Sequence, residues 1–260
     1  MNAEQLSPQQ MQFWKENDYV LLPSYFTPEQ TQQMIKWVED IAKWPVVEGK
    51  YFNYYEMINN EARISRTENF LAYHSDFNKM VRTSGLFEIM DEILGEPTVL
   101  FKEKINYKYP GTGEYPPHQD VHAADSSIYA FQPYHRNITI FLDEATEENG
   151  CMELGSGYKK NEILDRYPNG SILETEAAKL DWKPLLCPKG SVFIFDMFWP
   201  HLSKVNKSNS PRRSIFMTFN GISKGDLREA HYIDRAKSKP NSREIKSNLV
   251  NQTNLFSAKK

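Results

Sequence analysis

The sequence lacks several features typical of secreted, membrane-bound or nucleic-acid-binding proteins. Its two cysteines, Cys151 and Cys187, form no C-x-x-C pair and are too few for a disulfide framework. No apolar run approaches the roughly 20 residues of a membrane span, and the polar start of the chain has no apolar signal core. The 31 basic and 34 acidic residues give a formal charge of −3, without a basic excess for nucleic acid. We therefore expect a cytoplasmic protein with no nucleic-acid or membrane partner.

The length and composition fit a globular protein with one large domain. The chain has 260 residues, of which 40% are hydrophobic and 25% are charged. We expect a single domain over residues 1–260, with a helical part over about 1–95 and a β-rich core over about 96–225. The polar tail over about 226–260, which includes the run AKSKPNSREIKSN, is expected to be loop or frayed helix.

Helix signals concentrate at the start of the chain and strand signals follow them. Ser7-Pro8 and Thr27-Pro28 each combine an N-cap residue with a proline at the first helical position, and Gly95 ends a third helical run, SGLFEIMDEILG. From residue 96 the runs TVLFKEKINYK, YHRNITIFLDEA, GSVFIFDMFWPH and RRSIFMTFNG are rich in β-branched and aromatic residues. Helices followed by several strands predict an antiparallel sandwich or barrel buttressed by helices.

The stretch EYPPHQDVH contains two candidate metal ligands, His118 and Asp120. On a strand, residues two apart share a face, so these side chains could reach one point. A third ligand could be His201, which ends the apolar run VFIFDMFWPH. Two histidines and one carboxylate bind one face of an iron octahedron and leave other positions open, whereas a structural zinc site usually has four closed ligands. The alternative for His201 is a partly buried, hydrogen-bonded histidine beside Trp199.

A candidate anion site follows these ligands. Arg212 lies eleven residues after His201, and on a strand it would share one face with Ser214, Phe216 and Thr218. A guanidinium next to a hydroxyl suits a carboxylate, so a dicarboxylate could chelate a metal at one end and bind Arg212 at the other. The alternative is a surface Arg-Arg pair, a description that fits Arg213 on the opposite face.

These motifs, HQD, then PHLS, then PRRS, resemble the phytanoyl-CoA dioxygenase family of iron(II)- and 2-oxoglutarate-dependent oxygenases over roughly residues 10–225. The resemblance implies an α+β fold with a double-stranded β-helix core, which is a cupin-like jelly-roll, buttressed by N-terminal helices. It also implies Fe(II), 2-oxoglutarate and O2, with hydroxylation of a C–H bond and release of succinate and CO2. Because related halogenases leave the carboxylate position empty, Asp120 favours hydroxylation.

The resemblance assigns individual residues to these roles. The metal ligands are His118, Asp120 and His201, and Arg212 binds the distal carboxylate of 2-oxoglutarate. Further 2-oxoglutarate contacts are Ser203, Ser214 and Thr139, and the strand KEKINYK, which resembles that of ectoine hydroxylase, adds Lys104 and Asn106. Alternation places Lys102, Lys104, Asn106 and Lys108 on one face, although three lysines on one face could also mark a solvated sheet edge.

The substrate is predicted from weaker signals. The runs RTENF, LFKEKINYK and PPHQD look most like bacterial members related to 2-aminoethylphosphonate dioxygenase. Residues 51–74 resemble the segment that covers the site in relatives, although an ordinary polar loop is an alternative. The predicted substrate is a small organophosphonate such as 2-aminoethylphosphonate or an N-methylated analogue. Arg66 and Lys102 would then hold the phosphonate, and Glu68 or an aromatic edge would hold the amine. The full set of predicted substrate residues is Lys102, Arg66, Glu68, Tyr55 and Phe198.

Other functions stay open at this point. The substrate could be another small metabolite or an acyl-CoA. The same three ligands could serve a zinc-dependent hydrolase or isomerase, which would need neither 2-oxoglutarate nor Arg212, and a jelly-roll could also be a non-catalytic binding module. The sequence does not decide the oligomeric state, or whether His122 lines the pocket.

Overall fold

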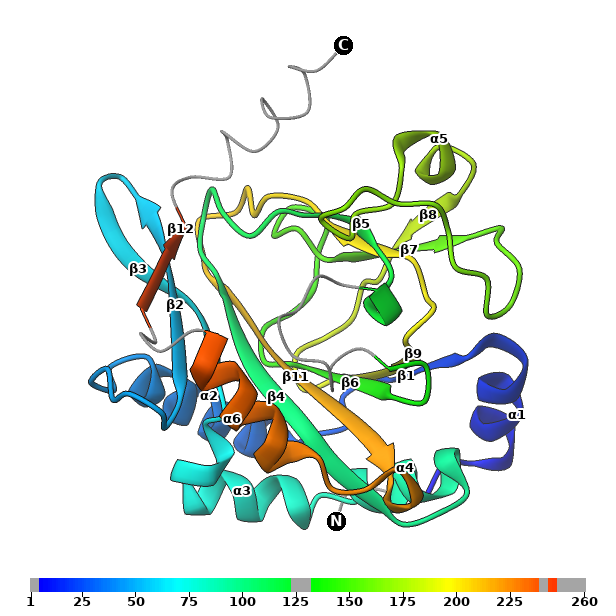
Figure 1. The fold of residues 1–260 in the computed structure, drawn as a ribbon, viewed down its shortest axis with the longest axis horizontal. Coiled ribbons are helices and arrows are strands. Elements are labelled where there is room, and N and C mark those ends of the chain that lie inside the picture. The colour runs from blue at the N-terminus through cyan, green and yellow to red at the C-terminus, as the bar shows by residue number, and fades with distance from the viewer. Residues whose placement is uncertain (1–4, 123–131, 239–242, 247–260) are drawn as a thin grey trace.

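Two β-sheets form the centre of the computed structural model, which describes residues 5–122, 132–238 and 243–246 (Figure 1). The larger sheet contains, in spatial order, β1 (Tyr19–Leu22), β9 (Val192–Asp196), β6 (Arg136–Phe141), β11 (Arg212–Gly221), β4 (Thr98–Lys108), β3 (Glu61–Glu68), β2 (Phe52–Ile58) and β12 (Arg243–Lys246). The smaller sheet contains β5 (Tyr115–His118), β10 (His201–Ser203), β7 (Met152–Ser156) and β8 (Asp181–Pro184).

The helices follow the predicted start and stop signals. Ser7 and Thr27 accept hydrogen bonds from the third backbone amides of α1 (Pro8–Asn17) and α2 (Pro28–Ile41), each of which begins with proline. Gly95 ends α4 (Leu86–Leu94) in the left-handed conformation, with φ of 72°. The remaining helices are α3 (Ser75–Arg82), α5 (Glu174–Ala177), α6 (Arg228–Ser238) and the short 3-10 helices η1 (Leu71–Tyr73), η2 (Asp120–His122) and η3 (Ile222–Lys224).

The larger sheet has an apolar face toward the N-terminal helices and a more polar face toward the smaller sheet. Ile105, Ile215 and Ile140 stand in cross-strand register on β4, β11 and β6, and they belong to the same buried cluster as Met34 and Val38 of α2. A second buried cluster, which includes Phe141, Met152, Phe193 and Trp199, joins the two sheets. Residues that alternate with the apolar face therefore point between the sheets.

Two strands lie in a region where the sequence predicted helix or polar loop. The hairpin of β2 and β3 pairs with β4 and extends the larger sheet. Its turn uses Asn59 and Asn60, both at positive φ (51° and 65°), which suits a two-residue hairpin. A register shift between Tyr54 and Tyr55 breaks the period-two pattern, and this irregularity hid the strand from the sequence analysis.

The polar tail, predicted to be loop or frayed helix, contains a packed helix and the strand β12. In α6, His231, Tyr232 and Arg235 are buried, and Tyr232 stacks on Phe52 of β2. The helix lies along β4 on the side of β2 and β3 (Figure 1). Its polar residues form buried ion pairs, and therefore its sequence did not look like that of a packed helix. None of the helices in the described residues combines the length and the apolar character needed to cross a membrane.

Candidate active site

His118, Asp120 and His201 converge between the two sheets. Their ligand atoms all lie within 4.8 Å of one another. His118 ends β5 and faces His201 of β10 directly in the sheet register, with 4.2 Å between ring centroids. Asp120 is not on a strand as predicted, because β5 stops at His118 and Asp120 begins η2. The change of direction after His118 brings Asp120 Oδ1 to 3.9 Å from His118 Nε2.

Backbone carbonyls orient both imidazoles. His118 Nδ1 lies 2.8 Å from the Pro116 oxygen, and His201 Nδ1 lies 2.9 Å from the Trp199 oxygen. Each Nδ1 therefore donates its proton to a carbonyl, and each Nε2 is left with a lone pair for a metal. Burial and the neighbouring His201 lower the pKa of His118 to about 4, so this imidazole is neutral at pH 7.

The carboxylate of Asp120 is held by a short chain of hydrogen bonds. Asn137 Nδ2 on β6 donates to Asp120 Oδ2 over 2.6 Å. Thr218 on β11 in turn donates its hydroxyl to Asn137 Oδ1 over 2.8 Å. Asn137 and Thr218 are both buried. This chain occupies one carboxylate oxygen and leaves Oδ1 facing the histidines, an arrangement that fits a divalent metal bound by two neutral nitrogens and one carboxylate oxygen.

The candidate ligands border a cavity of about 80 Å3. Its walls come from β4, β5, β6, β7, β10 and β11. The lining side chains are Lys104, Asn106, Tyr115, His118, Asp120, Phe141, Met152, His201, Leu202, Ser203, Arg212 and Phe216. The lining combines apolar side chains with Lys104 and Arg212, so the cavity suits a small polar molecule.

Arg212 is buried at the start of β11 and lines the cavity. Its Nη2 and Nε donate to the backbone oxygens of Gly150 and Asn149 over 3.1 and 3.3 Å. Burial lowers the pKa of Arg212, but a guanidinium remains charged at neutral pH. Among the described residues no carboxylate forms an ion pair with it. The cavity therefore has a buried cation available for an anionic ligand.

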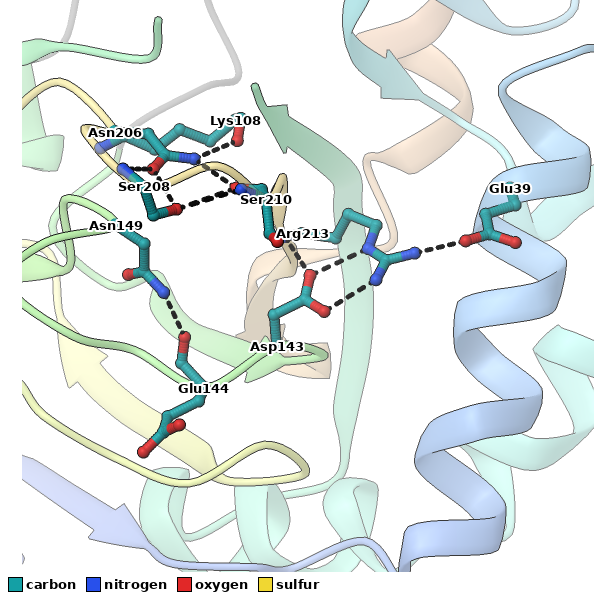
Figure 2. Close-up of polar contacts among 9 residues, drawn as sticks. All are labelled: Glu39, Lys108, Asp143, Glu144, Asn149, Asn206, Ser208, Ser210 and Arg213. Carbon is teal, nitrogen blue, oxygen red and sulfur yellow. Dashed lines mark hydrogen bonds and ion pairs between the residues drawn. The ribbon is translucent and has the colours of Figure 1, made fainter. Parts of the chain in front are cut away.

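The neighbouring Arg213 points to the opposite face, as alternation predicted. It donates to both oxygens of Asp143, over 2.9 and 2.7 Å, and to Glu39 of α2 over 2.6 Å (Figure 2). These ion pairs join the sheet to the N-terminal helix. The two adjacent arginines thus have different surroundings: within the described residues Arg212 has no carboxylate partner, whereas Arg213 has two.

The other predicted 2-oxoglutarate residues lie on the same inner faces. Lys104, Asn106 and Ser203 line the cavity. Ser214 is buried in register with Asn106, and Thr139 is buried with an unpaired Oγ1 in register with Phe216. Both follow the inner face, although they are not lining residues. The solvated-edge interpretation of the lysines is wrong, because β4 lies between β3 and β11.

None of the five predicted substrate residues is among the residues that line the cavity. Arg66 Nε lies 3.1 Å from Glu68 Oε1, and Arg235 of α6 reaches the same oxygen at 3.3 Å. Lys102 follows the inner face of β4 in register with Thr218, and Tyr55 packs against the main hydrophobic cluster. The carbonyl of Phe198 accepts a hydrogen bond from Gln119. The side chain of His122 lies outside the described residues.

The contacts of Asn137 with Asp120, of Thr218 with Asn137 and of Lys108 with Ser203 were not predicted from the sequence. Thr218 was placed on the correct face of its strand, and Lys108 was placed on the face of Lys104. Asn137 begins NITIFLD, where it lies two residues before Thr139 and so shares its face. The alternation of side chains along each strand therefore indicated that these residues face the site. No sequence motif indicated which of the residues on that face contact the metal ligands.

Comparison with known proteins gives close relatives over most of the chain. A family model described as phytanoyl-CoA dioxygenase (PhyH) matches residues 14–214. A methylphosphonate hydroxylase from Gimesia maris is 35% identical over 233 residues, which cover 90% of this chain and 88% of that protein. A 2-aminoethylphosphonate dioxygenase from an uncultured bacterium is 34% identical, and the match covers 87% of this chain and 86% of that protein.

Solved structures of low sequence identity share the fold. EctD from S. alaskensis with bound Fe has a TM-score of 0.65 and 18% identity, and the match covers 84% of this chain and 78% of that chain. The non-heme alpha-ketoglutarate-dependent carbocyclase SnoK has a TM-score of 0.65 and 17% identity, and the match covers 88% of this chain and 93% of that chain. These similarities and the two facing sheets confirm the predicted α+β class with a jelly-roll core.

Proposed function

The chain belongs to the phytanoyl-CoA dioxygenase family, and we propose that it is an iron(II)- and 2-oxoglutarate-dependent hydroxylase of a small organophosphonate. The reaction consumes the substrate, 2-oxoglutarate and O2, and it gives the hydroxylated product, succinate and CO2. The buried, free Cys151 and Cys187 support a cytoplasmic location, where thiols stay reduced.

His118, Asp120 and His201 are the proposed ligands of the iron. The metal supplies, when bound, the redox chemistry that splits 2-oxoglutarate and transfers oxygen to the substrate. The protein supplies geometry: two carbonyl-bound imidazoles and one carboxylate held by Asn137. Three ligands on one side leave room for the co-substrate, which a closed four-ligand site would not.

Arg212 is the proposed partner of the distal carboxylate of 2-oxoglutarate. It is the cavity-lining guanidinium, and its fork matches a carboxylate. Ser203, Asn106 and Lys104 border the same cavity, and Ser214 and Thr139 lie behind its wall. The co-substrate would then extend from the metal ligands toward β11.

The observation that carries the phosphonate class is the basic wall along β3 and β4. Lys104 lines the cavity, and Lys102 precedes it on the same face. Burial would raise the pKa of Glu68, but Arg66, Arg235 and these two lysines lower it. Four basic side chains thus act on the Glu68 carboxylate, and this excess of positive charge suits a phosphonate dianion. Phosphonates are also named as substrates of both close relatives.

The same wall favours an alkylphosphonate without an amine. Glu68 is already bound by Arg66 and Arg235, at 3.1 and 3.3 Å. Among the described lining residues Asp120 is the remaining carboxylate, and it is a proposed metal ligand. An ammonium group would therefore find little compensation, and we propose methylphosphonate-like substrates ahead of 2-aminoethylphosphonate.

Succinate release by the iron-loaded protein tests this proposal. Methylphosphonate should raise succinate release well above a blank without substrate, and 2-aminoethylphosphonate should raise it less. Acetate and β-alanine, the matched carboxylates, serve as controls and should leave the blank unchanged. If no phosphonate stimulates turnover while 2-oxoglutarate binds, the substrate class is wrong. Activity that needs neither iron nor 2-oxoglutarate would instead indicate a zinc hydrolase or isomerase.

A further inference from the structure

A second buried cation lies next to Arg212. Lys108 is the last residue of β4, and its Nζ donates to the Gly150 oxygen over 2.7 Å and to Ser203 Oγ over 3.0 Å. Arg212 Nη2 donates to the same Gly150 oxygen over 3.1 Å. Lys108 is 4% exposed and Arg212 is 7% exposed, so water screens neither charge well.

Two glycines, Gly113 and Gly150, leave the space that the Lys108 side chain occupies. A Cβ atom on Gly113 would lie 2.3 Å from Lys108 Cγ, and a Cβ atom on Gly150 would lie 2.7 Å from Lys108 Nζ. The backbone end of the residue is fixed as well, because Asn206 Nδ2 donates to the Lys108 oxygen over 2.9 Å (Figure 2). The side chain of Lys108 is therefore held in place and has little room to turn toward solvent.

No carboxylate within the described part of the chain forms an ion pair with Lys108. The charged groups that face it are Arg212 from β11, Glu114 before β5 and Glu56 from β2, with the thiol of Cys151 beside the turn. Burial and the charge of Arg212 lower the pKa of Lys108 to about 7. Among the described residues neither Arg212 nor Lys108 has a carboxylate ion-pair partner, and holding both of these buried groups in the charged form is costly unless an anion binds.

Given the proposed function, we propose that Lys108 is the second cation of the 2-oxoglutarate site and takes up a proton when the distal carboxylate binds at Arg212. Without a ligand, the positive charge of Arg212 disfavours the ammonium form of Lys108. A carboxylate bound at Arg212 offsets that charge and attracts the ammonium group, so it favours the protonated form of Lys108. Binding is then linked to protonation, so the affinity for 2-oxoglutarate falls as pH rises above neutral. A lysine that only braced the Gly150 turn and Ser203 would not produce this linkage.

Calorimetry of 2-oxoglutarate binding measures the proton directly. The protein is loaded with Mn(II) in place of iron, so binding is read without turnover. Titrations in buffers of different ionisation enthalpy, such as phosphate and Tris, give the number of protons taken up. We expect about one proton per 2-oxoglutarate at pH 8 and about none at pH 6. Oxalate, which can chelate the metal but has no distal carboxylate, should take up none at either pH.

Two substitutions separate charge from packing. Lys108→Met removes the charge at similar length, and we expect weaker binding, no proton uptake and an affinity that no longer changes with pH. Lys108→Arg keeps a permanent charge, and we expect binding without proton uptake, even if the methionine variant does not fold. Lys36→Met, on the exposed side of α2, is the matched control and should behave like the wild type.

The proton uptake measured in these titrations decides whether Lys108 belongs to the 2-oxoglutarate site. The inference is overturned if the wild type takes up no proton at pH 8, if Lys108→Met takes up as many as the wild type, or if oxalate takes up as many as 2-oxoglutarate. If 2-oxoglutarate does not bind the Mn(II)-loaded protein, the proposed function itself fails. Proton uptake limited to 2-oxoglutarate and to an intact Lys108 supports the two-cation site.

Discussion

Asn137 Nδ2 donates a hydrogen bond to Asp120 Oδ2 over 2.6 Å, and so fixes which oxygen of the carboxylate faces the two histidines. Thr218 fixes Asn137 in the same way. If these residues orient the carboxylate, their removal should weaken metal binding rather than only destabilise the fold. Asn137→Ala and Thr218→Val should each raise the Mn(II) dissociation constant roughly 10- to 100-fold. Thr218→Ser keeps the donor and should bind metal like the wild type. Equal affinity in Thr218→Val and Thr218→Ser would contradict this role.

Arg212 and Arg213 form a natural pair of test and control. Arg212→Ala removes the cavity guanidinium, so the KM for 2-oxoglutarate should rise on the order of 100-fold. Arg213→Ala breaks the contacts with Asp143 and Glu39 on the other face, so it should lower the melting temperature and leave that KM unchanged. A similar KM change in both variants would mean that the effect is structural.

Lys104 should act on the phosphonate more than on 2-oxoglutarate. It lies on the basic wall, in register with Glu68 and away from the end of β4 near Arg212. Lys104→Met should raise the KM for the phosphonate roughly 10- to 100-fold, since a charged hydrogen bond is lost. The KM for 2-oxoglutarate should change less. The opposite pattern would place Lys104 with the co-substrate, as the sequence resemblance implied.

Asp196 should make stability depend on pH. Burial raises the pKa of its carboxyl to about 6, from an ordinary value near 4. The folded state therefore favours the protonated form, and this contribution is lost as pH rises through about 6. Asp196→Asn should be more stable than the wild type at pH 8, by about 1–3 kcal/mol, and the two should converge near pH 4. Urea unfolding at both pH values measures the difference, and a constant difference would contradict it.

Glu103 should be important for the docking of α6. It is buried on the outer face of β4, where it accepts hydrogen bonds from both terminal nitrogens of Arg228 and from the Leu71 amide. Glu103→Ala should cost about 3–5 kcal/mol of unfolding free energy, because Arg228 would lose its counter-ion. Lys43→Ala breaks the exposed pair with Asp40 and should cost within about 0.5 kcal/mol. Denaturant titration of both variants checks the contrast.

Much of the site could be predicted because it follows alternation along strands. Arg212, Ser214 and Thr218 occupy the inner face of β11 as expected, and His201 meets His118. Asp120 reaches the same point through a turn that no period describes. Lys108 donates a hydrogen bond to Ser203, and Asn137 donates one to Asp120. These partners are far away in sequence, and a single sequence contains no record of such contacts.

The fold was predictable where local signals were strong. Capping residues gave the starts of α1 and α2, while β2 and α6 were missed because a bulge and buried charges disguised their packed faces. Tertiary contacts decide such segments, and local preference does not. A single domain over residues 1–260 stays a prediction.

The pairing of His118 with His201 limits where this chain can change in length. Both residues lie at matching positions of two antiparallel neighbours, and this pairing already contains a register shift between His201 and Ser203. A further one-residue insertion within β5 or β10 would therefore move one imidazole away from the other. Length changes in the turns outside these strands would leave the pairing intact. Natural variants and engineered versions with preserved activity should therefore carry their insertions in the loops and none between Tyr115 and His118.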